Sequence, residues 1–295
     1  MSNNLRHWFG RAIGLAAFGA FSASAGAVTL LGITSANELA RIDTNNIAAA
    51  SRVAISGLDA GDRFVGIDLR PADNQVYGIT LSNRIYTVNA ANGATSFVAN
   101  LSSPVVDPTL GYGFDFNPSA DFAGASSLRF TSSMGSNFAI NPMTGVVGNE
   151  TSNIGAGNTA VAYSNAAILP TMAPASTELY YINSNTDTLS VALTGFNSPT
   201  ITTIGALGVD VLKANGFELL ANGQAFAALN VDGGTSLVTG IYGINLATGA
   251  ATLIGDYNGT LSGLTLAPIP EPGSIAMMVA GLAALGFVGR RRRRA

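Results

Sequence analysis

The chain is 295 residues long, only 11% of its residues are charged, and it contains no cysteine. Its only histidine is His7, so the rest of the chain lacks the imidazole and the thiolate that Ser-His-Asp catalysis, Cys-His catalysis and ordinary zinc or haem sites require. Residues 28–267 carry seven basic and sixteen acidic side chains, about −9 in all, against −3 for the whole chain. Such an acidic domain is a poor partner for nucleic acid or anionic lipid.

Residues 1–27 have the layout of a secretory signal peptide. Arg6 and Arg11 supply positive charge, Ala12–Phe21 is a short apolar run, and residues 23–27 offer the small side chains of a cleavage site. An uncleaved anchor is the alternative, but the apolar run is well short of the ~20 residues that a transmembrane helix needs. We therefore expect the chain to be exported.

A four-residue motif recurs along the middle of the chain. Its copies begin at steps of 47, 47, 56 and 47 residues, and they are Gly66–Leu69, Gly113–Phe116, the weaker Ala160–Tyr163, Gly216–Leu219 and Gly263–Leu266. Strand-forming repeats of roughly 40 to 50 residues are typical of propeller blades. The long step carries nine extra residues, for which Pro170–Ser176 and Gly205–Asn215 are the candidate loops.

Alternating side chains and recurring turns predict four strands in each repeat. In the repeat over Gly66–Asn100, Ile67 and Leu69 share one face of the first strand while Asp68 takes the other. Three turns pair an Asn with a Gly four residues later, an arrangement that suits bulged hairpins: Asn89 with Gly93, Asn141 with Gly145, and Asn245 with Gly249.

The two ends of the repeat region complement each other. The first repeat lacks a first strand, although Thr29–Thr34 and Glu38–Asp43 match the second and third strands of the next repeat. Conversely, Gly263–Leu266 is a first strand with nothing after it. We therefore predict an all-β, five-bladed propeller over residues 28–267, closed by pairing of the last strand with the N-terminal blade, which removes exposed sheet edges.

The C-terminus combines three features in a fixed order. Pro268–Pro272 is a rigid spacer, Ser274–Gly289 is an apolar stretch of sixteen residues, and an arginine cluster follows it: Arg290, Arg291, Arg292, Arg293 and Arg294. The arginines are expected to stay cytoplasmic. As a helix the apolar stretch would span roughly 24 Å, short for a ~30 Å bilayer core. A marginal anchor and a transient, processed one are both compatible with this length.

Pro270, Glu271 and Pro272, with the hydrophobic helix and arginine cluster behind them, resemble the PEP-CTERM sorting tail of Gram-negative bacteria. The resemblance covers residues 268–295 and implies processing by exosortase while the tail is held in the inner membrane. It also implies association with exopolysaccharide, biofilm or floc matrix.

The middle of the chain resembles a second family. Val65–Pro71, Gly111–Pro118, Ile204–Asp210 and Ile244–Ala250 are similar to a bacterial family of secreted domains of unknown function, numbered 4394. This resemblance spans most of Leu30–Leu266 and implies one continuous domain, but no activity.

Asp68, Asp115 and Glu218 occupy the same register on three first strands, and we assign Tyr163 and Thr265 to that register in the other two blades. Because first strands line the channel of a propeller, the three acids are candidates to face one another. They could bind calcium, which needs neither His nor Cys, or act as the carboxylate pair of a glycoside hydrolase. The structural alternative, which we favour, is that they accept backbone N–H groups of neighbouring blades.

The leading functional prediction is therefore a non-enzymatic module of the cell surface or matrix, with loops that contact polysaccharide or protein. No catalytic residue and no resident metal are assigned. A carboxylate-based glycosidase and a calcium-stabilised polysaccharide-binding propeller are the alternatives, and a structural coat protein without a specific ligand is a third.

Overall fold

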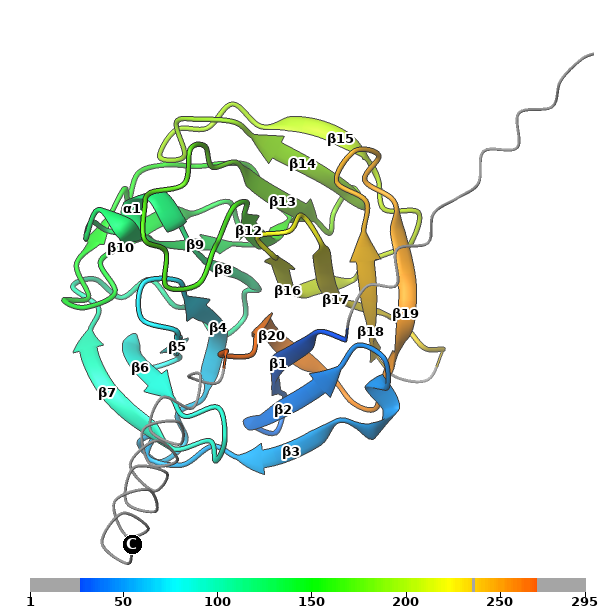
Figure 1. The fold of residues 1–295 in the computed structure, drawn as a ribbon, viewed down its shortest axis with the longest axis horizontal. Helices are drawn as coiled ribbons and strands as arrows, with labels where there is room; N and C mark the ends of the chain where they lie inside the picture. Colours follow the sequence, from blue (N-terminus) through cyan, green and yellow to red (C-terminus); the bar gives the residue numbers. More distant parts are fainter. Residues whose placement is uncertain (1–26, 235–236, 270–295) are drawn as a thin grey trace, which may run out of the picture.

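The computed structural model describes residues 27–234 and 237–269 of the chain. In this part, five four-stranded antiparallel sheets surround a central axis, so that each sheet is one blade of a propeller (Figure 1). The predicted all-β fold and the predicted five blades are confirmed. The first 26 residues of the predicted signal peptide (residues 1–27) lie outside the described residues, as do Pro270, Glu271, Pro272, the apolar segment and the arginine cluster. Within the described ranges, no helix is long and apolar enough to cross a membrane.

From β1 to β19 the strands fill the blades in chain order, and the last strand, β20, belongs to blade one. Blade one contains β20 (Leu261–Leu266), β1 (Thr29–Thr34), β2 (Glu38–Asp43) and β3 (Ser51–Ala54), with a short helix η1 (Ile47–Ala49) before β3. Blade two contains β4 (Phe64–Arg70), β5 (Gln75–Thr80), β6 (Arg84–Val88) and β7 (Thr95–Asn100). Blade three contains β8 (Tyr112–Phe116), α1 (Pro118–Phe122), β9 (Leu128–Ser132), β10 (Asn137–Ile140) and β11 (Val147–Gly148).

The last two blades are built in the same way. Blade four contains β12 (Asn158–Tyr163), β13 (Leu179–Asn183), β14 (Thr188–Ala192) and β15 (Thr202–Ala206). Blade five contains β16 (Lys213–Leu219), β17 (Ala225–Asp232), β18 (Leu237–Ile244) and β19 (Ala251–Tyr257).

The C-terminal strand closes the ring. Strand β20 pairs antiparallel with β1, with Leu30 opposite Leu266 and Gly32 opposite Leu264. The predicted closure is therefore confirmed. Leu261 and Leu264 of β20 are buried in one apolar cluster with residues of blades one and five, so the closing strand contributes to the core between these blades.

Four of the five repeats open with a glycine and the repeat on β12 opens with Ala160. These glycines are explained by the crowding of the inner strands β4, β8, β12, β16 and β20. A Cβ atom built on Gly216 would lie 2.4 Å from the backbone nitrogen of Leu264 in the next blade, and one on Gly113 would lie 3.0 Å from the nitrogen of Val161. Real Cβ atoms rarely come so close, so the inner strands can approach one another only where the side chain is absent.

The predicted Asn–Gly turns are also present. The Asn245 side chain accepts the N–H groups of Ala247 at 2.9 Å and Thr248 at 3.1 Å, while Gly249 has a φ of +84°. A Cβ on Gly249 would also lie 2.6 Å from the carbonyl oxygen of Gly205. Both backbone conformation and space therefore require glycine at this position.

The nine extra residues of the long repeat all lie in one loop. In blade two, Leu69 pairs with Val76, seven residues later, whereas in blade four Tyr163 pairs with Leu179, sixteen residues later. The difference is nine residues. The insertion is therefore the connection between β12 and β13, which contains Pro170–Ser176, and Gly205–Asn215 is not needed to explain it.

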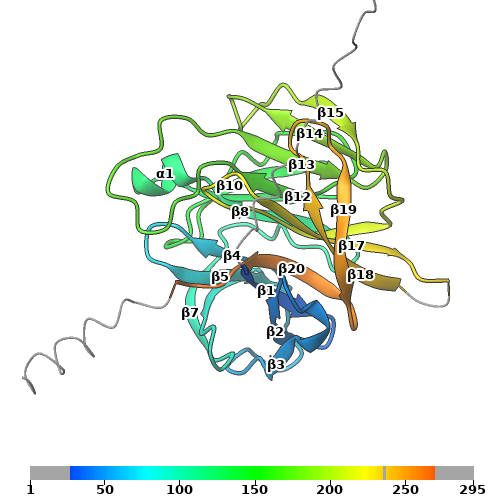
Figure 2. The same ribbon diagram turned by 45° about the vertical axis from the view of Figure 1, so that its right-hand side comes forward.

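The connections that follow the inner strands gather on one face of the ring, which we call the exit face. It comprises the turn after β4, helix α1, the loop of residues 164–178 (the inserted loop), the turn after β16 and residues 267–269. In Figure 2, α1, the inserted loop and the end of β20 lie on the same side of the molecule. The chain therefore leaves the propeller on the face that carries the insertion.

Candidate functional site

The inner strands bring three of the predicted residues together at the axis. Asp68 on β4, Asp115 on β8 and Glu218 on β16 each place a carboxylate oxygen within 4.8 Å of the others. Their side chains are buried, with 3% to 6% exposed. Thr265 on β20 joins them, because its hydroxyl contacts both Asp68 and Glu218.

Tyr163 does not occupy the position that we predicted for it. Its backbone N–H donates to Asp115, just as the N–H of Phe116 donates to Asp68, so Tyr163 is equivalent to Phe116 rather than to Asp115. Its hydroxyl accepts from the guanidinium of Arg129 at 3.1 Å. The residue equivalent to the acids in blade four is the preceding one, Ala162. The 47-residue step from Asp115 also leads to Ala162, so the assignment of Tyr163 to this register was one residue off.

Each polar side chain at the axis accepts a backbone N–H group from the next blade. Four such bonds are present: Phe116 N to Asp68 Oδ2 at 2.9 Å, Tyr163 N to Asp115 Oδ1 at 3.0 Å, Leu266 N to Glu218 Oε2 at 2.9 Å, and Leu69 N to Thr265 Oγ1 at 2.8 Å. Blades four and five lack this bond because Ala162 has no polar side chain. The acids therefore join the blades to one another.

The two contacts of Thr265 with the acids can both be hydrogen bonds only when a carboxyl group carries a proton. Its Oγ1 lies 2.8 Å from Asp68 Oδ1 and 3.0 Å from Glu218 Oε2. A threonine hydroxyl has one proton, so it can donate to only one of these oxygens. The other contact is a hydrogen bond only if that carboxyl group donates its own proton to Thr265.

Burial raises the pKa of each of the three acids. Loss of hydration raises the pKa of Glu218 to about 7. Burial, together with the charges of neighbouring acids, also raises the pKa values of Asp68 and Asp115 well above the usual range of an aspartate. Three carboxylates so close together cannot all remain charged in a low-dielectric interior. The cluster therefore retains protons near neutral pH.

The acids are closed off from large molecules. The cavity beside them has a volume of about 10 Å³, roughly the space of one water molecule. Its lining includes Pro71 from the turn after β4, and Ala166 and Ile168 from the inserted loop. On the other side of the acids, the axis is lined by the repeat glycines and holds a second cavity of about 10 Å³.

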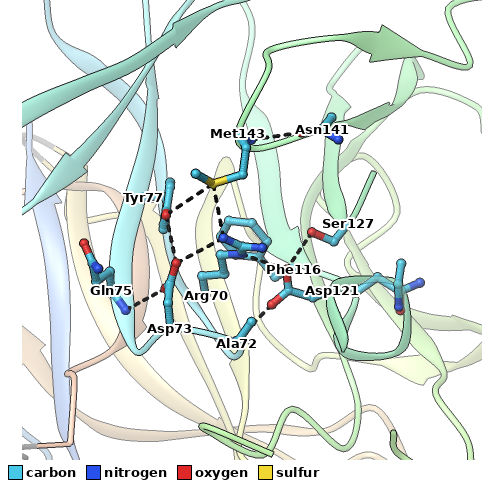
Figure 3. Close-up of polar contacts among 12 residues, drawn as sticks. Arg70, Ala72, Asp73, Gln75, Tyr77, Phe116, Asp121, Ser127, Asn141 and Met143 are labelled. Atoms are coloured by element: carbon cyan, nitrogen blue, oxygen red, sulfur yellow. Dashed lines mark hydrogen bonds and ion pairs between the residues drawn. The ribbon is translucent and has the colours of Figure 1, made fainter. Parts of the chain in front are cut away.

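A second polar network lies on the exit face and joins blades two and three. The Arg70 guanidinium donates to Asp121 at 2.7 Å and to Asp73 at 3.0 Å (Figure 3). Asp121, on α1, is 3% exposed and also accepts the N–H of Ala72 and the hydroxyl of Ser127. Because Asp121 on α1 accepts hydrogen bonds from Arg70 and Ala72, the network holds α1 against the turn after β4.

The inserted loop borders a pocket on this face. This pocket of about 520 Å³ is lined by Pro118, Ala221 and loop residues that include Leu169, Pro170 and Met172. Sequence reasoning did not find this pocket. The nine-residue insertion was the only signal for it, and it located a loop without showing what the loop would border.

Comparison with known proteins identifies two segments of the chain. Residues 38–265 match the family model of the Domain of unknown function (DUF4394), and residues 268–294 match the PEP-CTERM protein-sorting motif. That motif is the recognition signal of exosortase and indicates export and sorting to the cell surface or extracellular space. No curated protein matches the chain.

Solved structures with similar folds are distant in sequence. The calcium-binding protein regucalcin from Agrobacterium tumefaciens is 14% identical over 76% of this chain and 68% of its own, with a TM-score of 0.41. A protein from Bacteroides uniformis, provisionally assigned as a 6-phosphogluconolactonase, is 10% identical over 79% of this chain and 83% of its own, also with a TM-score of 0.41. A protein of unknown function from Bacteroides thetaiotaomicron is 11% identical over 78% and 58%, with a TM-score of 0.42. The family match covers most of the propeller, and the chain therefore belongs to the DUF4394 family.

Proposed function

We propose that this protein is a non-enzymatic binding and structural module of the cell surface or extracellular matrix, sorted there by its C-terminal tail. Its connecting loops, rather than its axis, contact exopolysaccharide or surface proteins of a biofilm. The observation that carries the proposal is the burial of Asp68, Asp115 and Glu218 in hydrogen bonds between blades.

The rival function is a glycoside hydrolase that uses these acids as its carboxylate pair. The small volume of the cavity beside the acids argues against this function. Ligand pockets are typically ~300–1,000 Å³ in volume, whereas the cavity beside the acids has about 10 Å³. A sugar could reach the carboxyl groups only if Pro71 and the inserted loop moved away. It would also have to compete with the backbone N–H groups that bind the acids.

One experiment separates binding from hydrolysis. The purified domain is incubated with the exopolysaccharide of the producing organism, and both co-sedimentation and new reducing ends are measured. We expect retention without new reducing ends, and the same retention for Asp115→Asn. Reducing ends released by the wild type but not by Asp115→Asn would contradict the proposal.

Calcium is the second candidate ligand of the acids, favoured by the spacing of their oxygens within 4.8 Å. A calcium ion needs six to eight oxygen ligands, but both oxygens of Asp68 already accept backbone N–H groups. We expect no change of melting temperature in millimolar calcium. A clear rise would favour the calcium-stabilised alternative.

Tail processing is tested on the secreted protein itself. The proposal requires transient insertion of the apolar segment in the inner membrane and cleavage by exosortase near Pro270–Pro272. Mass spectrometry of the extracellular form should therefore find a chain without Arg290–Arg294. Surface protein that still carries all five arginines would argue against processing.

A further inference from the structure

The chain leaves the propeller at a fixed point on the exit face. After β20, the N–H of Ala267 donates to the carbonyl of Thr29 at 2.9 Å. Two residues later, the Asn74 side chain forms two hydrogen bonds with the backbone of Ile269, accepting its N–H at 3.0 Å and donating to its carbonyl at 2.8 Å. The start of the sorting tail is thus attached to the turn after β4.

Only a short spacer separates this point from the apolar segment of the tail. Five residue steps join Ile269 to Ser274, and an extended chain covers at most ~3.6 Å per residue, so the two are no more than about 18 Å apart. While Ser274–Gly289 is held in a membrane, the exit face must therefore lie close to the lipid surface.

The inserted loop presents apolar side chains on this same face. Residues 164–178 include no charged residue before Glu178. Met172 is 74% exposed and Leu169 is 54% exposed, although both are large and apolar. Ile269, at the exit point, is 53% exposed. Exposed apolar patches of this kind mark surfaces that contact a partner or a membrane.

Contacts within the fold hold the loop beside the exit point. The N–H of Leu169 donates to the carbonyl of Pro71 at 2.8 Å, in the same turn that carries Asn74. Ile168 turns inward and packs against the core cluster that contains Leu69. The loop is therefore fixed next to the tail, with one apolar side chain directed inward and its neighbour directed outward.

We propose that the inserted loop, residues 164–178, rests on the lipid surface through Leu169 and Met172 while the tail is still in the membrane. This inference depends on the proposed membrane insertion of the tail, and it adds which face of the propeller meets the bilayer. The contact is apolar rather than electrostatic, because the domain carries about −9 and is repelled by anionic lipid. The sorted protein is thereby held with the exit face toward the membrane, and its other surfaces stay free for matrix partners.

A single tryptophan can report the contact, because Trp8 is the only tryptophan of the chain. The full chain with Trp8→Phe and Met172→Trp is reconstituted in phosphatidylcholine vesicles, with and without brominated acyl chains. The matched control is Trp8→Phe with Phe97→Trp, which places the reporter on β7, the outer strand of blade two, where Phe97 is 55% exposed.

We expect both variants to float with the vesicles. Fluorescence from position 172 should be quenched by the brominated lipid roughly two-fold or more relative to position 97, because interfacial side chains are buried ~5–10 Å into the boundary of headgroups and acyl chains. Equal, weak quenching at both positions in floating protein would overturn the inference and leave membrane insertion of the tail intact.

Two other outcomes would also overturn it. A blue-shifted emission from position 172 without lipid quenching would mean that protein, such as the apolar tail itself, covers the loop. Failure of both variants to float would reject membrane insertion and, with it, the proposed route of sorting.

Discussion

Asn74 and Ile269 lie 195 residues apart in sequence, yet the side-chain amide of Asn74 pairs with the backbone of Ile269 through two hydrogen bonds. Asn74 has a φ of +56°, in the left-handed region that asparagine tolerates better than most residues. The pair connects blade two to the residue that immediately precedes the Pro-Glu-Pro motif.

The first prediction concerns this pair. Asn74→Gly keeps the left-handed backbone but removes both hydrogen bonds, so the amide of Ile269 should lose its protection from hydrogen exchange. The amide of Leu266, which donates to Glu218, serves as the internal control and should stay protected. The global stability should fall by no more than about 1 kcal/mol. Unchanged protection at Ile269 would show that the pair does not form in solution.

The second prediction is a loss of stability as pH rises. Burial raises the pKa of folded Glu218 to about 7, above the ~4.3 of an unfolded glutamate. Between these values the folded chain binds more protons than the unfolded chain, so its free energy of unfolding decreases with pH. The stabilisation by protonated Glu218 is complete below about pH 4 and lost above about pH 7, amounting to about 4 kcal/mol.

Glu218→Gln tests this assignment, because glutamine stays neutral and can still accept the N–H of Leu266. Denaturant unfolding at pH 5 and pH 8 should show a smaller pH dependence, and higher stability than wild type at pH 8. The exposed glutamate Glu150 provides the control, and Glu150→Gln should retain the wild-type profile. An unchanged profile in Glu218→Gln would reject Glu218 as the titrating group.

The third prediction concerns the hydroxyl at the axis. Thr265→Val keeps the side-chain shape but removes the group between Asp68 and Glu218, so unfolding should become easier by about 1–3 kcal/mol. Thr252→Val, at an exposed position of β19, should change stability by less than about 0.5 kcal/mol. Equal effects of the two substitutions in chemical denaturation would argue against a role for the hydroxyl.

The fourth prediction compares two strand glycines. In Gly216→Ala the new Cβ would meet the Leu264 nitrogen at 2.4 Å, whereas in Gly243→Ala the nearest atom is 3.8 Å away. We expect Gly216→Ala to cost about 1–3 kcal/mol through displacement of the inner strands. Gly243→Ala should be close to neutral. Melting temperatures of the two variants give the comparison, and similar values would contradict the packing argument.

The fifth prediction concerns ring closure. Deletion of residues 262–266 leaves β1 without its inner partner and removes Thr265 from the axis. The melting temperature of the whole domain should fall, because both blade one and the axis lose contacts. An unaltered melting transition would show that closure by β20 contributes nothing to stability.

Local patterns were enough to predict the five blades, their closure and most turns. Period-2 alternation, the recurring glycine and the Asn–Gly turns depend on a few neighbouring residues, so they are visible in the sequence. The error at Tyr163 arose where the motif had degenerated to Ala160–Tyr163. The 47-residue step from Asp115 leads to Ala162, and the hydrogen bond from the Tyr163 N–H to Asp115 confirms that register.

The sequence alone determined that the chain folds as a closed ring of five repeats and ends in a sorting tail, because each signal is local and repeated. Only the tertiary structure decided that Thr265 joins Asp68 and Glu218 in a closed site, and that the tail leaves beside the inserted loop. These properties depend on distances of a few ångströms between residues 47 to 197 positions apart. Such distances arise from the packing of whole blades and leave no trace in local sequence patterns.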